Sequence, residues 1–136
     1  YYRQASVAFE YCRKKNDMMW YYTFDDIAVD YISDTCCKEF SPEDLCAHEL
    51  IQLMEYDRKN KTELYKTLVT YILNERNTVA TSSSLYVGRS TLFYRLRKIQ
   101  QITGLDTEHM AQPKQNLYLR LSIYIMENLN QINEQK

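Results

Sequence analysis

The spacing of apolar residues between positions 79 and 99 predicts two short helices joined by a tight turn. Apolar side chains recur at Val79, Leu85, Val87, Leu92, Leu96 and Ile99. From Leu92 onward the intervals are four and then three residues, which places these side chains in one stripe along a helix. Gly88 tolerates a positive φ, so we expect the turn there, and Ser90 or Thr91 could cap the second helix. The pattern predicts a helix-turn-helix with the apolar stripe buried.

The side of the second predicted helix opposite this stripe carries polar, cationic and aromatic residues. At about 100° per residue, that side displays Ser90, Tyr94, Arg97 and Gln101, flanked by Phe93 and Lys98. Arginine, amide and hydroxyl groups can contact phosphates and base edges in a DNA major groove. The sequence therefore predicts that this helix enters the groove of double-stranded DNA.

We expect the following residues to form the DNA-binding site: Arg89, Ser90, Phe93, Tyr94 and Arg97 at the groove, Lys98 at a phosphate, and Thr78 and Thr81 of the first helix as further phosphate donors. Solvation of a polar helix face is the alternative for the two threonines. Arg95 could contact a phosphate, or could be a structural residue paired with Asp57 or Glu75.

The remaining periodic segments also predict helices. We expect them over residues 3–15, 25–36, 41–56 and 61–75, and from Pro113 toward the C-terminus. The expected capping residues are Asp25, Ser41 and Asn60 at the starts of helices, and Gly104 at the end of the recognition helix. Residues 18–24 are aromatic-rich and of strand length, so they are a candidate short strand. The expected fold is mostly α, with the helix-turn-helix embedded in a bundle of about six helices.

Charge divides the chain into an acidic and a basic part. Residues 1–57 carry 5 basic and 12 acidic side chains, a net charge of −7, and residues 58–136 carry 12 and 6, a net charge of +6. Between positions 76 and 105 there are five basic residues and no acidic one. A basic island of this kind is typical of a nucleic-acid-binding domain. We therefore expect an acidic helical segment over 1–57 and a DNA-binding domain over 58–136.

The string Arg89-x-Thr91-Leu92-x-Tyr94-Arg95-Leu96, followed by Thr103-Gly104-Leu105-Asp106, resembles the C-terminal helix-turn-helix domain of PucR/CdaR-type bacterial transcriptional regulators. The upstream residues Tyr56-Asp57, Thr62-Glu63-Leu64, Thr67-Leu68 and Tyr71 are similar to the lead-in helix of that family. Gly88-Arg89-Ser90-Thr91 stands where the family often has His-Arg-Asn-Thr, and Ser82 stands where it favours alanine. The resemblance implies a sequence-specific DNA-binding output module, and residues 1–57 would be the tail of an upstream regulatory domain.

Regulators of this kind usually act as symmetric dimers that read paired half-sites. We expect a homodimer, formed through residues 117–126 or through the upstream domain of the same chain. The main alternative function is a degenerate helix-turn-helix that serves for dimerisation or protein interaction. No apolar run approaches the length of a membrane span, and we expect a cytoplasmic protein.

Other chemistry has weaker support in the sequence. The spacing does not match a familiar zinc-ligand pattern for Cys36, Cys37, Cys46 and His48. A thiol- or metal-sensing domain built on the three cysteines is a third hypothesis for the function. Neither histidine lies in a nucleophile–base arrangement, and the Ser82-Ser83-Ser84 run lacks the Gly-x-Ser-x-Gly elbow. We therefore expect neither an enzyme nor a bound cofactor or metal.

Overall fold

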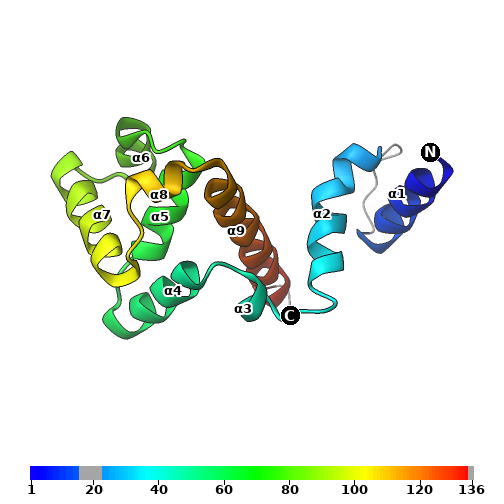
Figure 1. The fold of residues 1–136 in the computed structure, drawn as a ribbon, viewed down its shortest axis with the longest axis horizontal. Coiled ribbons are helices and arrows are strands. Elements are labelled where there is room, and N and C mark those ends of the chain that lie inside the picture. The colour runs from blue at the N-terminus through cyan, green and yellow to red at the C-terminus, as the bar shows by residue number, and fades with distance from the viewer. Residues whose placement is uncertain (16–22, 135–136) are drawn as a thin grey trace. The chain divides into compact units, whose positions relative to one another are not determined.

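The computed structural model describes residues 1–15 and 23–134, apart from the side chains of residues 15, 107 and 131–134. The described residues contain nine α-helices and no strand. They form two compact units, Tyr1–Ser41 and Pro42–Lys136. The first unit holds α1 (Tyr2–Lys15) and α2 (Phe24–Cys36); the second holds α3 (Pro42–Leu45), α4 (His48–Asn60), α5 (Leu64–Leu73), α6 (Thr78–Leu85), α7 (Arg89–Thr103), α8 (Thr107–Ala111) and α9 (Pro113–Glu134) (Figure 1). The predicted mostly-α fold is confirmed.

The candidate strand at 18–24 lies largely outside the described residues. Its last two residues belong to the start of α2, because Thr23 is the N-cap and Phe24 the first helical residue. The backbone N–H and the Oγ1 hydroxyl of Thr23 both donate to Oδ2 of Asp26, at 2.7 and 2.8 Å. This capping box requires an acceptor three residues after the cap. The predicted cap at Asp25 is therefore wrong.

The predicted helix over 41–56 is broken in the structure at Cys46 and Ala47. The backbone N–H of Ala47 leaves the helical pattern and donates to the Ser122 hydroxyl of α9 at 2.9 Å. The Cys46 thiol also points to the backbone carbonyl of Ser122, at 3.7 Å. All three residues are buried, so the bond to α9 satisfies a backbone group that would otherwise be orphaned. A tertiary contact thus divides one predicted helix into α3 and α4.

The turn between α4 and α5 also differs from the sequence prediction. The Asp57 carboxylate accepts from the backbone N–H groups of Leu64 and Tyr65, at 2.9 and 2.8 Å, and thereby satisfies the first turn of α5. The Asn60 side-chain amide instead donates to the carbonyl of Tyr56. The expected cap at Asn60 is wrong, and residues 57–60, which lie between two predicted helices, form the last turn of α4, with Lys61 as its left-handed C-cap.

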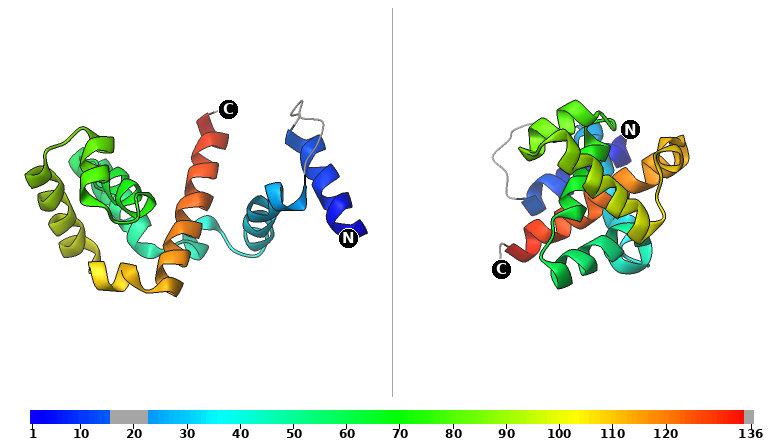
Figure 2. Two further views of the ribbon diagram at one scale, coloured as in Figure 1. Left: turned by 90° about the horizontal axis from the view of Figure 1, so that it is seen from above. Right: turned by 90° about the vertical axis from the view of Figure 1, so that its left-hand side faces the viewer.

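The core of the second unit is built from aliphatic side chains of four helices. Its fully buried members are Leu50 and Leu53 of α4, Leu68 and Ile72 of α5, Leu92 and Ile99 of α7, and Leu119 of α9. Helix α9 is a single long helix (Figure 2), and its Leu119 belongs to this core. Since α4 packs against α5 and α7, the compact unit that contains the helix-turn-helix begins at Pro42, whereas the sequence indicated a boundary after residue 57.

Candidate nucleic-acid interface

Helix α6 begins at a side-chain cap and ends in a left-handed residue. Oδ1 of Asn77 accepts from the backbone N–H groups of Val79 and Ala80, both at 3.0 Å. At the other end Tyr86 adopts φ 54° and ψ 38°, and its N–H donates to the Ser83 carbonyl at 3.3 Å. This ending closes the last turn of α6 and reverses the chain toward α7.

The reversal uses Tyr86 where the sequence predicted Gly88. Gly88 is the N-cap of α7, but its φ of −69° and ψ of 157° are ordinary extended values. Because the helix begins directly at Arg89, neither Ser90 nor Thr91 can be its cap, and these predictions are wrong. Gly104 at the C-terminus of α7 has φ 74°, so the predicted left-handed cap is confirmed there.

Helix α7 is anchored by one face against α4, α5 and α6. Leu92 and Ile99 are buried, while Leu96, Leu85 and Val87 are half-buried. Val79, predicted to share this stripe, is 70% exposed. Thr81 is completely buried instead, and its hydroxyl donates to the Asn77 carbonyl at 2.7 Å. The helix-turn-helix is thus held together as predicted except in α6, where the side chain of Thr81 is buried in place of that of Val79.

The opposite face of α7 is open. Arg89, Ser90, Phe93, Tyr94 and Arg97 are all exposed. The guanidinium of Arg89 lies 5.6 Å from the centre of the Phe93 ring, a cation–π geometry that reduces the freedom of both side chains. This face therefore presents two arginines, two aromatic rings and a hydroxyl along about two turns of helix.

The other two cations of α7 make contacts inside the unit. Nη1 of Arg95 donates to Oγ1 of Thr67 at 3.1 Å and lies 3.7 Å from Oε2 of Glu63. Arg95 is therefore tied to the start of α5, and the predicted pairing with Asp57 or Glu75 is wrong. Lys98 is half-buried, with its ammonium 5.9 Å from the centre of the Tyr56 ring of α4.

The two threonines that were expected to donate to phosphates differ in accessibility. Thr78 is half-buried at the start of α6. Thr81 has no exposed surface, and because its hydroxyl already bonds within α6, it has none to offer a phosphate. Thr81 is therefore not part of the exposed surface. Of the cations of α7, Arg89 and Arg97 are exposed and Lys98 is partly accessible.

The three cysteines that the sequence singles out as a possible sensor belong to two different units of the chain. Cys46 is buried against Ser122, while Cys36 and Cys37 are half-buried at the end of α2 in the other unit. In the part of the chain that the structure describes, no group of three or more His, Cys, Asp or Glu residues is arranged to hold a metal ion. None of the described helices is long and apolar enough to cross a membrane.

The sequence of this unit matches a known family. Residues 64–125, which run from the start of α5 into α9, match the PucR C-terminal helix-turn-helix domain. No solved structure matches the chain significantly.

Three relatives of this chain are named as regulators or transcriptional activators. The chain is 35% identical over 75 residues to the proline-responsive transcriptional activator PutR of Bacillus subtilis (strain 168), a match that covers 55% of this chain and 18% of PutR. It is 29% identical over 105 residues to the carbohydrate diacid regulator of Escherichia coli (strain K12), covering 77% of this chain and 26% of that protein. It is 31% identical over 80 residues to the DNA-binding transcriptional activator AdeR of Bacillus subtilis (strain 168), a match that covers 59% of this chain and 19% of AdeR.

These matches span about a quarter or less of each relative, so they identify a module rather than a whole protein. The helix pair, the open face of α7 and the left-handed cap at Gly104 lie within the matched segment. The helix-turn-helix of this chain therefore lies in a segment that is similar to the PucR C-terminal helix-turn-helix domain.

Proposed function

We propose that the second unit binds double-stranded DNA sequence-specifically, as the output module of a cytoplasmic bacterial transcriptional regulator. The observation that carries this proposal is the division of α7 into two faces. One face is fixed by Leu92 and Ile99 in the core, and the other exposes Arg89 and Arg97 with no acidic residue on the same helix. A rigidly held helix with free arginines suits insertion into a major groove.

On this proposal, the exposed residues Arg89, Ser90, Phe93, Tyr94 and Arg97 contact the groove. Lys98 and Thr78 lie at the flanks, where they contact phosphates. Arg95 stays in its structural contacts with α5. The protein performs no reaction in this role, because DNA binding requires only complementary charge, shape and hydrogen-bonding groups.

A homodimer is part of the same proposal, since a single helix-turn-helix reads a short half-site. Of the apolar residues of α9 expected at the dimer interface, Leu117 is 67% exposed and Tyr118 is 40% exposed. Ile125 and Met126 are buried within the unit. The exposed start of α9 therefore supports the dimer, and it also favours the second candidate function, an interaction module that has lost DNA binding.

Nuclease footprinting on the DNA next to the native gene tests the two candidates. The chain should protect one or two short segments there, with protection that weakens steeply as salt rises because bound counterions are released. Arg89→Ala with Arg97→Ala should remove the protection, whereas Arg3→Ala in the first unit should leave it unchanged. Concentration-dependent self-association without any protection of DNA would favour the interaction module.

A further inference from the structure

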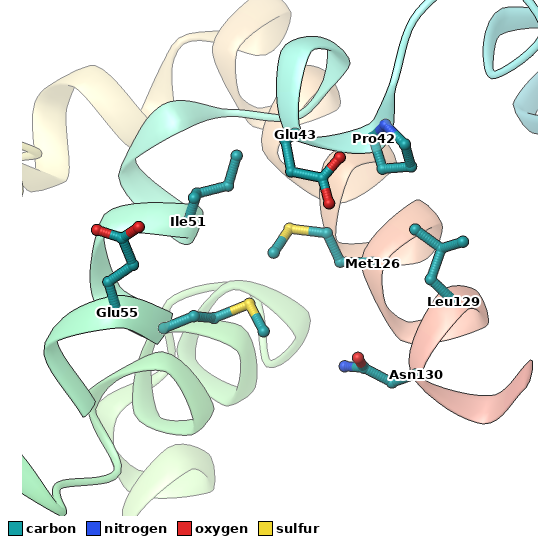
Figure 3. A pocket seen from close by; sticks show the side chains of 8 residues that line it. Pro42, Glu43, Ile51, Glu55, Met126, Leu129 and Asn130 are labelled. Atoms are coloured by element: carbon teal, nitrogen blue, oxygen red, sulfur yellow. The ribbon is translucent and has the colours of Figure 1, made fainter. Parts of the chain in front are cut away.

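A cavity of about 400 Å³ lies between α3, α4 and α9, away from the exposed face of α7. It is lined by Pro42, Glu43, Ile51, Met54, Glu55, Met126, Leu129 and Asn130. Figure 3 shows Glu43 of α3, Ile51 of α4 and Met126 of α9 around one hollow, with the Glu55 carboxylate on the other side of Ile51 from Glu43. A volume of this size is in the range of sites that hold small organic molecules, about 300–1,000 Å³.

The walls and the rim of this cavity differ in chemistry. Ile51, Met54 and Met126 provide an apolar wall, and the flexible thioethers can adapt to ligands of different shape. The carboxylates of Glu43 and Glu55 are exposed at the rim. Among the described residues, no lysine, arginine or histidine lines the cavity, so the negative charge of the two glutamates has no cationic counterpart in the lining.

We propose that this cavity binds a small organic cation, with its aliphatic body against Met54 and Met126 and its ammonium group beside the carboxylate of Glu43 or of Glu55. An apolar wall with unpaired carboxylates at its mouth complements a primary amine on an alkyl chain and disfavours the corresponding carboxylate. This assignment does not depend on the DNA-binding proposal.

The cavity shares a helix with the recognition element. Ile51 and Glu55 are on the face of α4 that lines the cavity. On another face, Gln52 donates through Nε2 to the Ile102 carbonyl of α7 at 3.0 Å, and the Tyr56 ring lies under Lys98. A ligand between α3, α4 and α9 therefore lies one helix away from α7.

Titration calorimetry of the chain with octylammonium, octanoate and 1-octanol tests the assignment. Octylammonium should bind more tightly than 1-octanol, and octanoate most weakly. Shortening octylammonium to butylammonium should weaken binding by up to about fourfold per buried methylene. Glu43→Gln or Glu55→Gln, whichever removes the carboxylate beside the ammonium group, should weaken octylammonium binding by about two- to fivefold, as expected for a partly exposed ion pair. The matched control Glu108→Gln, an exposed acid of α8, should bind octylammonium like the wild type.

A further variant tests whether octylammonium binds inside this cavity. Leu129→Trp should fill the cavity and remove octylammonium binding while the thermal unfolding of the chain stays cooperative. Equal binding of octylammonium and octanoate, or binding that is insensitive to both glutamine variants, would overturn the charge assignment. Failure of every small ligand while a basic amphipathic peptide binds would show that the hollow is a protein-docking groove and would equally overturn the proposal.

Discussion

Nη1 of Arg95 donates a hydrogen bond to Oγ1 of Thr67 at 3.1 Å and thereby ties the recognition helix α7 to α5. The side chain of Arg95 is only 22% exposed, and the Glu63 carboxylate lies 3.7 Å from the same nitrogen. The contact joins the middle of α7 to the first turn of α5. Of two neighbouring arginines in the same helix, Arg95 is thus a structural residue, whereas Arg97 is free at the surface.

Arg95→Ala should lower the free energy of unfolding by about 1–2 kcal/mol, because a hydrogen bond with a charged donor and the packing of its aliphatic stem are lost together. Arg97→Ala is the matched control and should change stability by no more than about 0.5 kcal/mol. Urea unfolding followed by circular dichroism measures both variants. Equal losses would contradict the separate roles of these residues.

The buried face of α7 allows a second stability comparison. Leu92 is completely buried and Leu96 is half-buried. Leu92→Ala should therefore cost about 2–5 kcal/mol, since it removes core packing and leaves a cavity. Leu96→Ala should cost less, about 1–2 kcal/mol. Urea unfolding of Leu92→Ala and Leu96→Ala compares the two losses in free energy of unfolding. A larger loss for Leu96→Ala than for Leu92→Ala would mean that α7 is rotated about its axis relative to the structure.

The features of this fold that the sequence predicts are those determined by residues close to one another in the chain. The helix-turn-helix, the helix predicted over residues 3–15 and the glycine cap at Gly104 follow from local periodicity and turn chemistry, and all are present. The break at Ala47 and the cap supplied by Asp57 depend on partners 75 and 7 residues away, respectively. Hydrophobic periodicity carries no information about such partners.

The turns illustrate the same limit. Among the described residues, Lys61, Glu75, Arg76 and Tyr86 have positive φ although none is glycine, while Gly88 does not. Glycine is only permissive for this conformation, so tertiary packing decided where the chain reverses. At the candidate site the exposed residues of α7 could be derived from helical geometry, but the burial of Thr81 could not, because it reflects how α6 sits on its neighbours.

The conformation of Tyr86 leads us to predict that a glycine at position 86 raises the free energy of unfolding, whereas a glycine at the nearby position 83 lowers it. A non-glycine residue in the left-handed region is strained by about 1–2 kcal/mol, and the Tyr86 side chain is 96% exposed, so it has little packing to lose. Tyr86→Gly should raise the free energy of unfolding by about 0.5–1 kcal/mol.

Ser83→Gly, at an exposed position within α6, is the control and should lower the free energy of unfolding by about 0.5–1 kcal/mol because glycine loses more backbone entropy in a helix. Thermal melts of both variants test the pair. Destabilisation by Tyr86→Gly would show that the phenol ring makes a contact that outweighs the backbone strain.

The capping box of α2 predicts a dependence on pH. Hydrogen bonds from the backbone and hydroxyl of Thr23 hold the pKa of Asp26 below its ordinary value. Because the folded pKa is depressed, the stabilisation is present above the ordinary aspartate pKa and is lost as pH falls through the depressed value. NMR titration of the Asp26 carboxyl should show this low pKa, and Thr23→Ala should raise it toward the ordinary value. Because the backbone N–H at position 23 is retained in this variant, an unchanged pKa in Thr23→Ala would contradict only the hydrogen bond from the Thr23 hydroxyl.

The last prediction separates two adjacent cations on the proposed DNA surface. Arg97 is exposed, and its planar fork suits bidentate hydrogen bonds to guanine, whereas the Lys98 ammonium lies beside the Tyr56 ring at the flank of α7. Arg97→Ala should cost about 1–3 kcal/mol on the protected duplex identified by footprinting and much less on a scrambled duplex. Lys98→Ala should weaken binding to both duplexes alike and reduce the salt dependence by about one ion.

Fluorescence anisotropy titrations at several salt concentrations measure both effects, with Arg97→Lys and Lys98→Arg as charge-preserving controls. Arg97→Lys should lose the preference for the protected duplex, because it keeps the charge without the fork, while Lys98→Arg should bind like the wild type. Equal losses on both duplexes for Arg97→Ala would reduce Arg97 to a phosphate contact. If neither alanine variant lost affinity, α7 would not be the helix that enters the groove, because these two side chains occupy its open face and its flank.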